Sequence, residues 1–269
     1  MINNAFKEIS FYIVAHADDW QLFMNPNAYL DLINEENKVV IIITTAGDAG
    51  KDREYWKARE EGCKSSVRFC LAPLYVIKEQ EGIRIINNHK IYFWNANHVT
   101  CYFMRLPDGN LDGVGFSNNY YLSLGKLKSQ EILSITALDH STLYSDWEDF
   151  YSTLNGIIIH EKEGISNTWI NYLNPELKDH DHPDHRATGN AVQAMNILPE
   201  VHQGLFSGYG CGSPEVISNT DLFWKAGMLA AYEKAVFDNC GYSTLKEDVP
   251  QYLDWCFRKA SFLQIISPM

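Results

Sequence analysis

Residues 11–19 read FYIVAHADD, an apolar run that ends in one imidazole and two carboxylates. Buried parallel strands have continuous β-branched and aromatic sequences, and parallel-sheet proteins carry their chemistry just beyond the carboxyl ends of such strands. Because His16, Asp18 and Asp19 are all metal-ligand types, the stretch predicts a strand followed by a functional site. It could equally form a polar turn in which Asp18 or Asp19 caps the next helix. Taken alone, the stretch leaves both interpretations open.

A second strand pattern stands at residues 38–45, which read KVVIIITT and are apolar on both faces. The glycine-containing loop AGDAG at 46–50 and a helix predicted over 55–71 follow it, and such a βα unit favours a parallel sheet. Between 82 and 106, short β runs alternate with Asn-rich turns, which predicts antiparallel strands at a sheet edge. We therefore expect an α/β fold, formed by residues 1–269 as a single domain. Its sheet should be Rossmann-like and mostly parallel, with helices on both faces and an antiparallel edge region.

The remaining segments with regular apolar patterns predict further strands and helices. The strands are expected at 74–77, 157–159, 168–170 and 205–209, and the helices at 26–34, 123–130, 146–154, 184–198 and 221–237. No repeat, low-complexity tract or linker interrupts the sequence, which supports the expectation of one domain.

Composition and charge narrow the range of partners. Of the 269 residues, 46% are hydrophobic and 21% are charged, and the formal net charge of −12 has no basic tract to offset it. This balance disfavours nucleic acid and anionic membrane surfaces, whereas small neutral or cationic molecules fit better. We expect no signal peptide, because residues 1–5 lack a basic segment and a long apolar segment, and no apolar run approaches the ~18–20 residues of a membrane span. The six cysteines lack C-x-x-C spacing, so we expect buried free thiols in a cytoplasmic protein.

A second polar motif, HPDH at residues 182–185, is predicted in a loop that leads into a helix, and His180 lies two residues before it. Three of the chain's nine histidines fall within these six residues, although an exposed loop of histidines and aspartates is an alternative. Together with the first motif, the set contains the imidazole and carboxylate ligands that suit Zn²⁺, with Fe²⁺, Co²⁺ or Mn²⁺ as substitutes. Three such ligands leave one position open, and a remaining carboxylate could serve as the base for metal-assisted hydrolysis.

The motifs together resemble the PIG-L (LmbE-like) family of zinc-dependent N-acetyl-sugar deacetylases. That family carries His-Pro-Asp-Asp after its first strand and His-x-Asp-His late in the chain, which correspond here to HADD at 16–19 and HPDH at 182–185. The segments TAGDAG at 45–50 and YWKARE at 55–60 resemble the family's glycine loop and arginine-bearing helix. The similarity extends from about Ile13 to Gln193, which is most of the chain.

The resemblance implies a role for each polar residue of the two motifs. His16, Asp19 and His185 would bind zinc. Asp18 would be the general base, close to the metal but not bound to it. His182 would stabilise the tetrahedral oxyanion as a protonated imidazole, and it could help to protonate the departing amine.

The resemblance also implies three substrate contacts. Arg59 matches the family arginine that touches the substrate, and Asp108 matches a carboxylate that binds sugar hydroxyls. His180 stands where some members have a tyrosine and would contact the substrate in its place. Two departures leave the ligands and the base intact: Ala17 replaces a proline, and Trp20 stands where an acidic residue is usual. We expect Trp20 to add an aromatic face to the mouth of the pocket.

We therefore expect an enzyme that removes the acetyl group from an N-acetylated amine carried by a small sugar or glycoside. One alternative is an amide or ester hydrolase that acts on a non-sugar biosynthetic metabolite, because the aromatic-rich residues between 92 and 121 would suit a flatter ligand. The same aromatic residues could instead pack in the sheet. A third hypothesis is a non-catalytic sugar- or metal-binding module, against which Asp18 argues because a binding site needs no base. The sequence does not define the oligomeric state.

Overall fold

The structure is a computed structural model that describes residues 6–177, 181–210, 217–257 and 262–268. Within these residues, eight strands form one sheet in the order β10-β9-β8-β1-β2-β5-β4-β3, and two short strands form a second sheet. In sequence order the strands are β1 (Glu8–Val14), β2 (Asn37–Thr45), β3 (Glu79–Ile86), β4 (His89–Ala96), β5 (Val99–Leu106), β6 (Ile135–Thr136), β7 (Leu143–Tyr144), β8 (Asn167–Leu173), β9 (His202–Phe206) and β10 (Phe262–Ile266).

The centre of the large sheet is parallel. Strands β9, β8, β1, β2 and β5 run in the same direction. At one edge β4 and β3 continue antiparallel beyond β5, and at the other edge β10 pairs antiparallel with β9. The predicted fold class is thereby confirmed, and β5 proves to be the strand at which the parallel and antiparallel parts meet.

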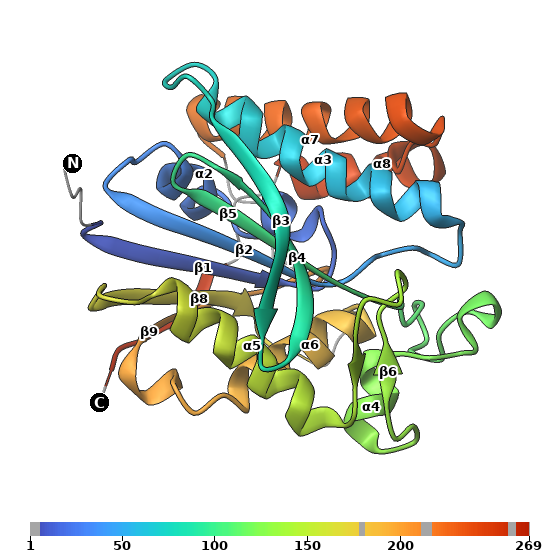
Figure 1. Ribbon diagram of the computed structural model, residues 1–269. Coiled ribbons are helices and arrows are strands. Elements are labelled where there is room, and N and C mark those ends of the chain that lie inside the picture. Colours follow the sequence, from blue (N-terminus) through green and yellow to red (C-terminus); the bar gives the residue numbers. More distant parts are fainter. Residues whose placement is uncertain (1–5, 178–180, 211–216, 258–261, 269) are drawn as a thin grey trace.

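Helices cover both faces of the sheet (Figure 1). Helices α3, α7 and α8 lie on one face, and α4, α5 and α6 lie on the other. The helices are α1 (Asp19–Phe23), α2 (Asn27–Leu32), α3 (Arg53–Leu71), α4 (Leu124–Ser129), α5 (Trp147–Glu161), α6 (Pro183–Gln193), α7 (Asn219–Cys240) and α8 (Leu245–Phe257). None of those in the described ranges combines the length and the apolar character that crossing a membrane requires.

The alternation of side chains along β1 explains its unbroken apolar sequence. Tyr12 and Val14 pack into the core on the α3 and α7 side, and Phe11 and Ile13 pack into the core on the α5 and α6 side. Each of these four side chains is at most 1% exposed. Burial of an apolar side chain of this size contributes roughly 1.5–3 kcal/mol, so β1 is fixed from both faces.

The order of strands around β1 determines where a site can form. Strands β2 and β5 lie on one side of β1, and β8 and β9 lie on the other. The segments that leave β1 and β8 at their carboxyl ends therefore diverge, and such a switch point leaves a crevice between them. Helix α1 begins within the first motif and α6 begins within the second. The topology thus brings two motifs that are far apart in sequence to one edge of the sheet.

Two of the predicted strands are wrong. Residues 157–159 belong to α5, because two of these isoleucines continue the buried helical face that Phe150 and Leu154 begin. Residues 74–77 lie between α3 and β3 outside any strand, and Val76 is 84% exposed. An apolar run of three or four residues therefore does not by itself distinguish a strand from the end of a helix or from a loop.

Candidate active site and metal centre

The first motif folds back on itself at the carboxyl end of β1. The backbone N–H of His16 donates to Asp19 Oδ2 at 2.7 Å, and Asp19 is the first residue of α1. Asp18, at the N-cap position of this helix, makes no side-chain capping hydrogen bond. The side chains are buried, with exposed fractions of 5% for His16, 3% for Asp18 and 2% for Asp19. The interpretation of this stretch as a polar capping turn is therefore wrong.

The second motif forms the start of α6. His182 is the N-cap residue, and its Nδ1 accepts a hydrogen bond from the backbone N–H of Asp184 at 3.2 Å. A proline follows it in the first turn, where its missing N–H leaves no hydrogen bond unmade. One turn into the helix, His185 Nε2 lies 3.1 Å from Asp19 Oδ1. The two motifs therefore meet across the crevice, as the sequence predicts.

His16, Asp19 and His185 form a buried group that could hold a metal ion. Their ligand atoms lie within 4.8 Å of one another, and His16 Nδ1 lies 3.6 Å from Asp19 Oδ1, whereas its Nε2 faces Asp184 Oδ2 at 3.5 Å. Asp181 Oδ1 accepts from His185 Nδ1 at 2.7 Å, which leaves Nε2 directed at Asp19. A carboxylate that orients the far side of a ligating imidazole is common in metal sites. These residues fit a divalent cation held by three protein ligands.

The charges of this group depend on one another. Burial lowers the pKa of His16, but Asp19 and Asp184 outweigh burial and hold that pKa well above its ordinary value. Burial also lowers the pKa of His185, yet Asp19 and Asp181 raise it to about 10. Burial raises the pKa of Asp19, and the two imidazoles bring it well below its usual range. The carboxylates thus favour positive charge between them. A histidine that ligates a metal is neutral, so a divalent cation bound here would supply that positive charge in place of the imidazole protons.

His182 lies on the other side of His16, with the two ring centroids 4.6 Å apart. A second group with ligand atoms within 4.8 Å of one another comprises His16, Asp108, His182 and Asp184, and it shares His16 with the first. Burial lowers the pKa of His182 and the neighbouring His16 lowers it further, so that it falls to about 4. Because Nδ1 accepts a hydrogen bond, the neutral ring carries its proton on Nε2, which lies 3.8 Å from Asp108 Oδ1.

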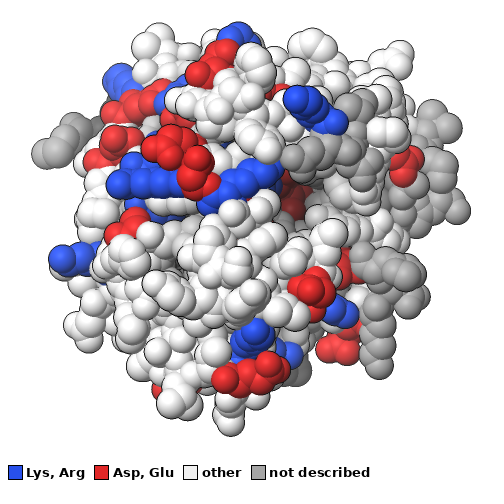
Figure 2. Space-filling view, turned by 90° about the vertical axis from the view of Figure 1, so that its right-hand side faces the viewer, with Lys and Arg blue, Asp and Glu red and all other residues white. Residues whose placement is uncertain are grey.

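A pocket of about 430 Å³ opens onto these groups, a volume within the range of ligand sites. Figure 2 shows the side of the molecule at the carboxyl ends of the parallel strands, with acidic atoms recessed in a hollow near its centre. The pocket brings together six of the predicted site residues: His16, Asp18, Asp19, Arg59, Asp108 and His182. His185 is 1% exposed and reaches the pocket through its contact with Asp19. His180 lies outside the described residues.

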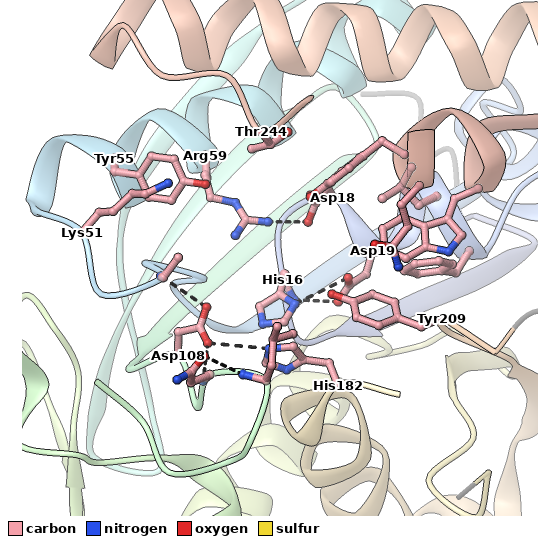
Figure 3. Close-up of a pocket in the computed structure, with 18 of the residues that line it drawn as sticks. His16, Asp18, Asp19, Lys51, Tyr55, Arg59, Asp108, His182, Tyr209 and Thr244 are labelled. Carbon is pink, nitrogen blue, oxygen red and sulfur yellow. Dashed lines mark hydrogen bonds and ion pairs between the residues drawn. The ribbon is translucent and has the colours of Figure 1, made fainter. Parts of the chain in front are cut away.

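Arg59 extends from α3 to the candidate base (Figure 3). Its Nη2 donates to Asp18 Oδ1 at 2.5 Å, its Nη1 donates to the carbonyl of Gly47 at 2.7 Å, and its Nε donates to the hydroxyl of Tyr232 at 2.7 Å. Gly47 has a φ of +56°, and a Cβ atom there would lie 2.5 Å from Arg59 Nη1. The loop after β2 therefore requires glycine at this position. The contact of Arg59 with a substrate stays a prediction.

Asp108 follows β5 and faces the pocket from the side opposite the C-terminal helices (Figure 3). Its Oδ1 accepts from the backbone N–H of Asn110 at 2.8 Å, and its Oδ2 accepts from that of Ala49 at 3.3 Å. Its own N–H donates to Asp48 Oδ1 at 2.9 Å. The carboxylate is thereby fixed between the loops after β2 and β5, where a substrate hydroxyl could donate to it.

The aromatic-rich middle of the chain packs mainly in the sheet. Trp94 and Tyr102 are fully buried in the two cores, whereas Phe116 lines the pocket. Trp20 is 0% exposed, lies within the core on the α3 side and is not part of the pocket wall. The prediction that Trp20 faces the pocket mouth is therefore wrong, because burial of its large ring in the core dominates.

Sequence reasoning missed the aromatic wall that the C-terminal part of the chain contributes. Tyr209, Tyr252 and Trp255 line the pocket. The rings of Tyr209 and Trp255 stack with centroids 4.6 Å apart, and Tyr209 meets His185 edge to face at 5.0 Å. Asp181 was missed as well, although its spacing of four residues from His185 was an available signal. The aromatic residues belong to no motif and gave no comparable signal.

Comparisons with known proteins identify a family and a similar fold. The PIG-L family, described as GlcNAc-PI de-N-acetylase, matches residues 11–196. Among solved structures, the N,N'-diacetylchitobiose deacetylase from Pyrococcus horikoshii, complexed with its inhibitor MPG, has a similar fold. Its TM-score is 0.53 with 14% identity, covering 99% of this chain and 87% of that chain. No curated protein matches the sequence at a significant level.

The fold and the site define an α/β protein with a candidate metal centre at the switch point of its sheet. The match over residues 11–196 shows further that the chain belongs to the PIG-L family, which confirms the resemblance drawn from its motifs. Both motifs and Arg59 and Asp108 lie inside the matched region, whereas the aromatic wall lies after it.

Proposed function

We propose that this protein is a metal-dependent hydrolase that removes the acetyl group from the N-acetylated amine of a small sugar or glycoside. The observation that carries the proposal is the position of Asp18. It lines the pocket beside the group of His16, Asp19 and His185 without belonging to that group. Three residues could then hold Zn²⁺, with Fe²⁺, Co²⁺ or Mn²⁺ as substitutes, while the fourth is left to accept a proton. The family description and the deacetylase with a similar fold support this proposal.

The chain's own residues would divide the chemistry between them. A bound cation would polarise the amide carbonyl and lower the pKa of water toward ~7. Asp18 would take the proton from the attacking water and could return it to the departing amine. His182 would donate a hydrogen bond from Nε2 to the oxyanion. With a pKa of about 4 this imidazole is neutral near neutral pH, so we revise the expectation of a protonated His182.

Two side chains on the polar side of the pocket would orient the sugar. Asp108 offers carboxylate oxygens to hydroxyl groups, and its backbone contacts keep it in place before a ligand arrives. Arg59 already donates to Asp18, so any contact that it makes with the substrate uses its remaining N–H groups. Both assignments are consistent with an uncharged, hydroxyl-rich substrate.

The experiment that tests the function measures acetate release from a panel of N-acetylated amino sugars and their glycosides. The wild-type protein should release acetate from at least one of them. Asp18→Asn should retain the metal by elemental analysis and lose about 10²–10⁴-fold in kcat, since an amide cannot accept the proton. Asp238→Asn, which changes an exposed carboxylate on α7, is the matched control. A loss of metal in Asp18→Asn, or turnover near that of the control, would contradict the assigned role.

A second candidate keeps the chemistry but changes the substrate. The aromatic wall of Tyr209, Tyr252 and Trp255 would suit an N-acyl amine or ester with a flatter, more apolar scaffold. Acetate release from aromatic acetamides, together with none from the sugar panel, would favour this candidate.

A further inference from the structure

The C-terminal helices contact the candidate base. Tyr252, on α8, donates its hydroxyl hydrogen to Asp18 Oδ2 at 3.2 Å. Tyr232, on α7, lies behind this pair, and its hydroxyl oxygen accepts from Arg59 Nε at 2.7 Å. Both helices follow residue 196, so neither tyrosine belongs to the region that the family match covers.

Asp18 is held at both of its oxygens. Arg59 Nη2 donates to Oδ1 at 2.5 Å (Figure 3), and Tyr252 donates to Oδ2 from the other side. An ionised carboxylate has about four acceptor sites, so about two remain after these bonds. Because donors at both oxygens oppose rotation of the carboxylate, they also fix the directions in which the remaining sites point. One donor alone would leave the carboxylate free to turn about its bond to Cβ.

Helix α8 is itself anchored at both ends. Near its start, the carboxylate of Glu233 on α7 accepts a hydrogen bond from the hydroxyl of Thr244. Near its end, the backbone carbonyl of Trp255 accepts from Lys225 Nζ at 2.7 Å, and Lys225 is 1% exposed. Tyr252 lies between these two anchors, so its hydroxyl reaches the base from a defined direction.

We propose that Tyr252 is a positioning residue for Asp18, and that α8 is thereby part of the catalytic machinery. The inference rests on the proposed function, in which Asp18 is the base. Tyr252 acts on the rate by keeping the carboxylate aimed at the water, and its hydroxyl is committed to Asp18, so it contributes little to the affinity for substrate. Misplacement of a catalytic group by about 1 Å is sufficient to lower a rate by about two orders of magnitude.

The kinetic test compares Tyr252→Phe with Tyr242→Phe. Tyr242 lies just before α8 and outside the pocket wall, so its variant controls for loss of a hydroxyl in the same region. Tyr252→Phe should lower kcat by about ten- to a hundredfold, with KM and metal content unchanged, because only the orientation of the Asp18 carboxylate is lost. Tyr242→Phe should match the wild type. A rise in KM at constant kcat would assign Tyr252 to substrate binding and overturn the proposal, as would an unchanged kcat.

A second measurement does not depend on activity. Thermal unfolding of Tyr252→Phe, Asp18→Ala and the double variant forms a cycle that detects coupling between the two side chains. We expect Tyr252→Phe to change Tm by a few degrees in the wild-type background and by much less when Asp18 is absent. Additive shifts would overturn the proposal whatever the kinetics show. If the wild type releases no acetate from any substrate, the proposed function fails, and the cycle still decides whether Tyr252 holds Asp18.

Discussion

The chain up to residue 196 and the chain after it contribute to the same pocket in different ways. The first part supplies the imidazoles and carboxylates from two short motifs, in which His16 and Asp19, and likewise His182 and His185, are three residues apart. The second part supplies aromatic side chains that are scattered along the sequence and held by tertiary packing. The two motifs at the strand ends therefore position the reactive groups through contacts that are short in sequence. The aromatic side chains around these groups depend on contacts between distant parts of the chain.

The sequence separation of the contacts shows the difference. His16 bonds to Asp19 across three residues, but Tyr252 reaches Asp18 across 234 residues. The role of a residue in the first part can therefore be predicted from residues close to it in the sequence. The role of a residue in the second part becomes apparent only in the folded structure. If this division is correct, substitutions in the first part should abolish metal binding or strongly lower the reaction rate. Substitutions in the second part should change kcat or KM more moderately and leave the metal bound.

The largest expected effect belongs to His185→Ala. The variant should lose the divalent ion, of which we expect about one per chain, because one of three protein ligands is removed. Activity should fall by about 10³-fold or more, since the metal supplies several kcal/mol of charge stabilisation. Elemental analysis and acetate release check this outcome, with the exposed His160→Ala on α5 as the control. Full metal content in His185→Ala would remove this residue from the ligand set.

The next effect in size belongs to His182→Ala. We expect kcat to fall by about two orders of magnitude with the metal retained, which is the scale of one lost oxyanion donor. The variant also removes the side-chain cap of α6, so its thermal stability should be measured alongside its kinetics. His182→Asn separates the two roles, because Asn can cap a helix as well as His does here. Near-normal turnover in His182→Ala would leave the oxyanion without help from this residue.

A smaller effect is expected from Asp181→Asn, which tests the support of the metal group within the first part of the chain. Asp181 accepts from His185 Nδ1 at 2.7 Å and also from the backbone N–H groups of His182 and Tyr209. Loss of such an outer-shell carboxylate typically weakens metal affinity by 10–100-fold. Competition with a chelator, followed by metal analysis, measures this change. An unchanged affinity would mean that Asp181 supports the loop and not the ligand.

Much of the fold could be predicted because β1 and β2 are apolar on both faces and are followed by loops. The errors have physical reasons. The isoleucines at 157–159 have high β-propensity, but they lie on the buried face of α5 that Phe150 and Leu154 share. Helix α8 was not predicted, and it contains Pro250, a residue type that normally ends a helix. In both places tertiary packing overrides local preference.

The candidate site likewise contains residues that could be predicted from the sequence and residues that could not. The resemblance of the two motifs to the PIG-L family implied that His16, Asp19 and His185 would form one group, and the structure brings these three residues together. Trp20 was assigned to the pocket because it adjoins the motif, but the core buries it. The stacked rings of Tyr209 and Trp255 could not be predicted, since they come from a loop after β9 and from α8.

The smallest expected effect is that of Trp255→Leu, and it tests the division between the two parts most closely. Trp255 stacks on Tyr209 and meets Phe23 and Tyr252 edge to face, in each case with ring centroids 5.3 Å apart. Aromatic pairs of this kind are worth about 0.5–1.5 kcal/mol, so KM should rise by about two- to tenfold as the wall loosens. We expect kcat to stay within about twofold and the metal content to be unchanged, because no ligand or base moves. Trp147→Leu, at the start of α5 on the opposite face of the sheet, controls for the loss of a large ring. A loss of metal or a large fall in kcat would show that the stacked rings of Tyr209 and Trp255, and not only the hydroxyl of Tyr252, hold the reactive groups in place, and the distinction between the two parts would then fail.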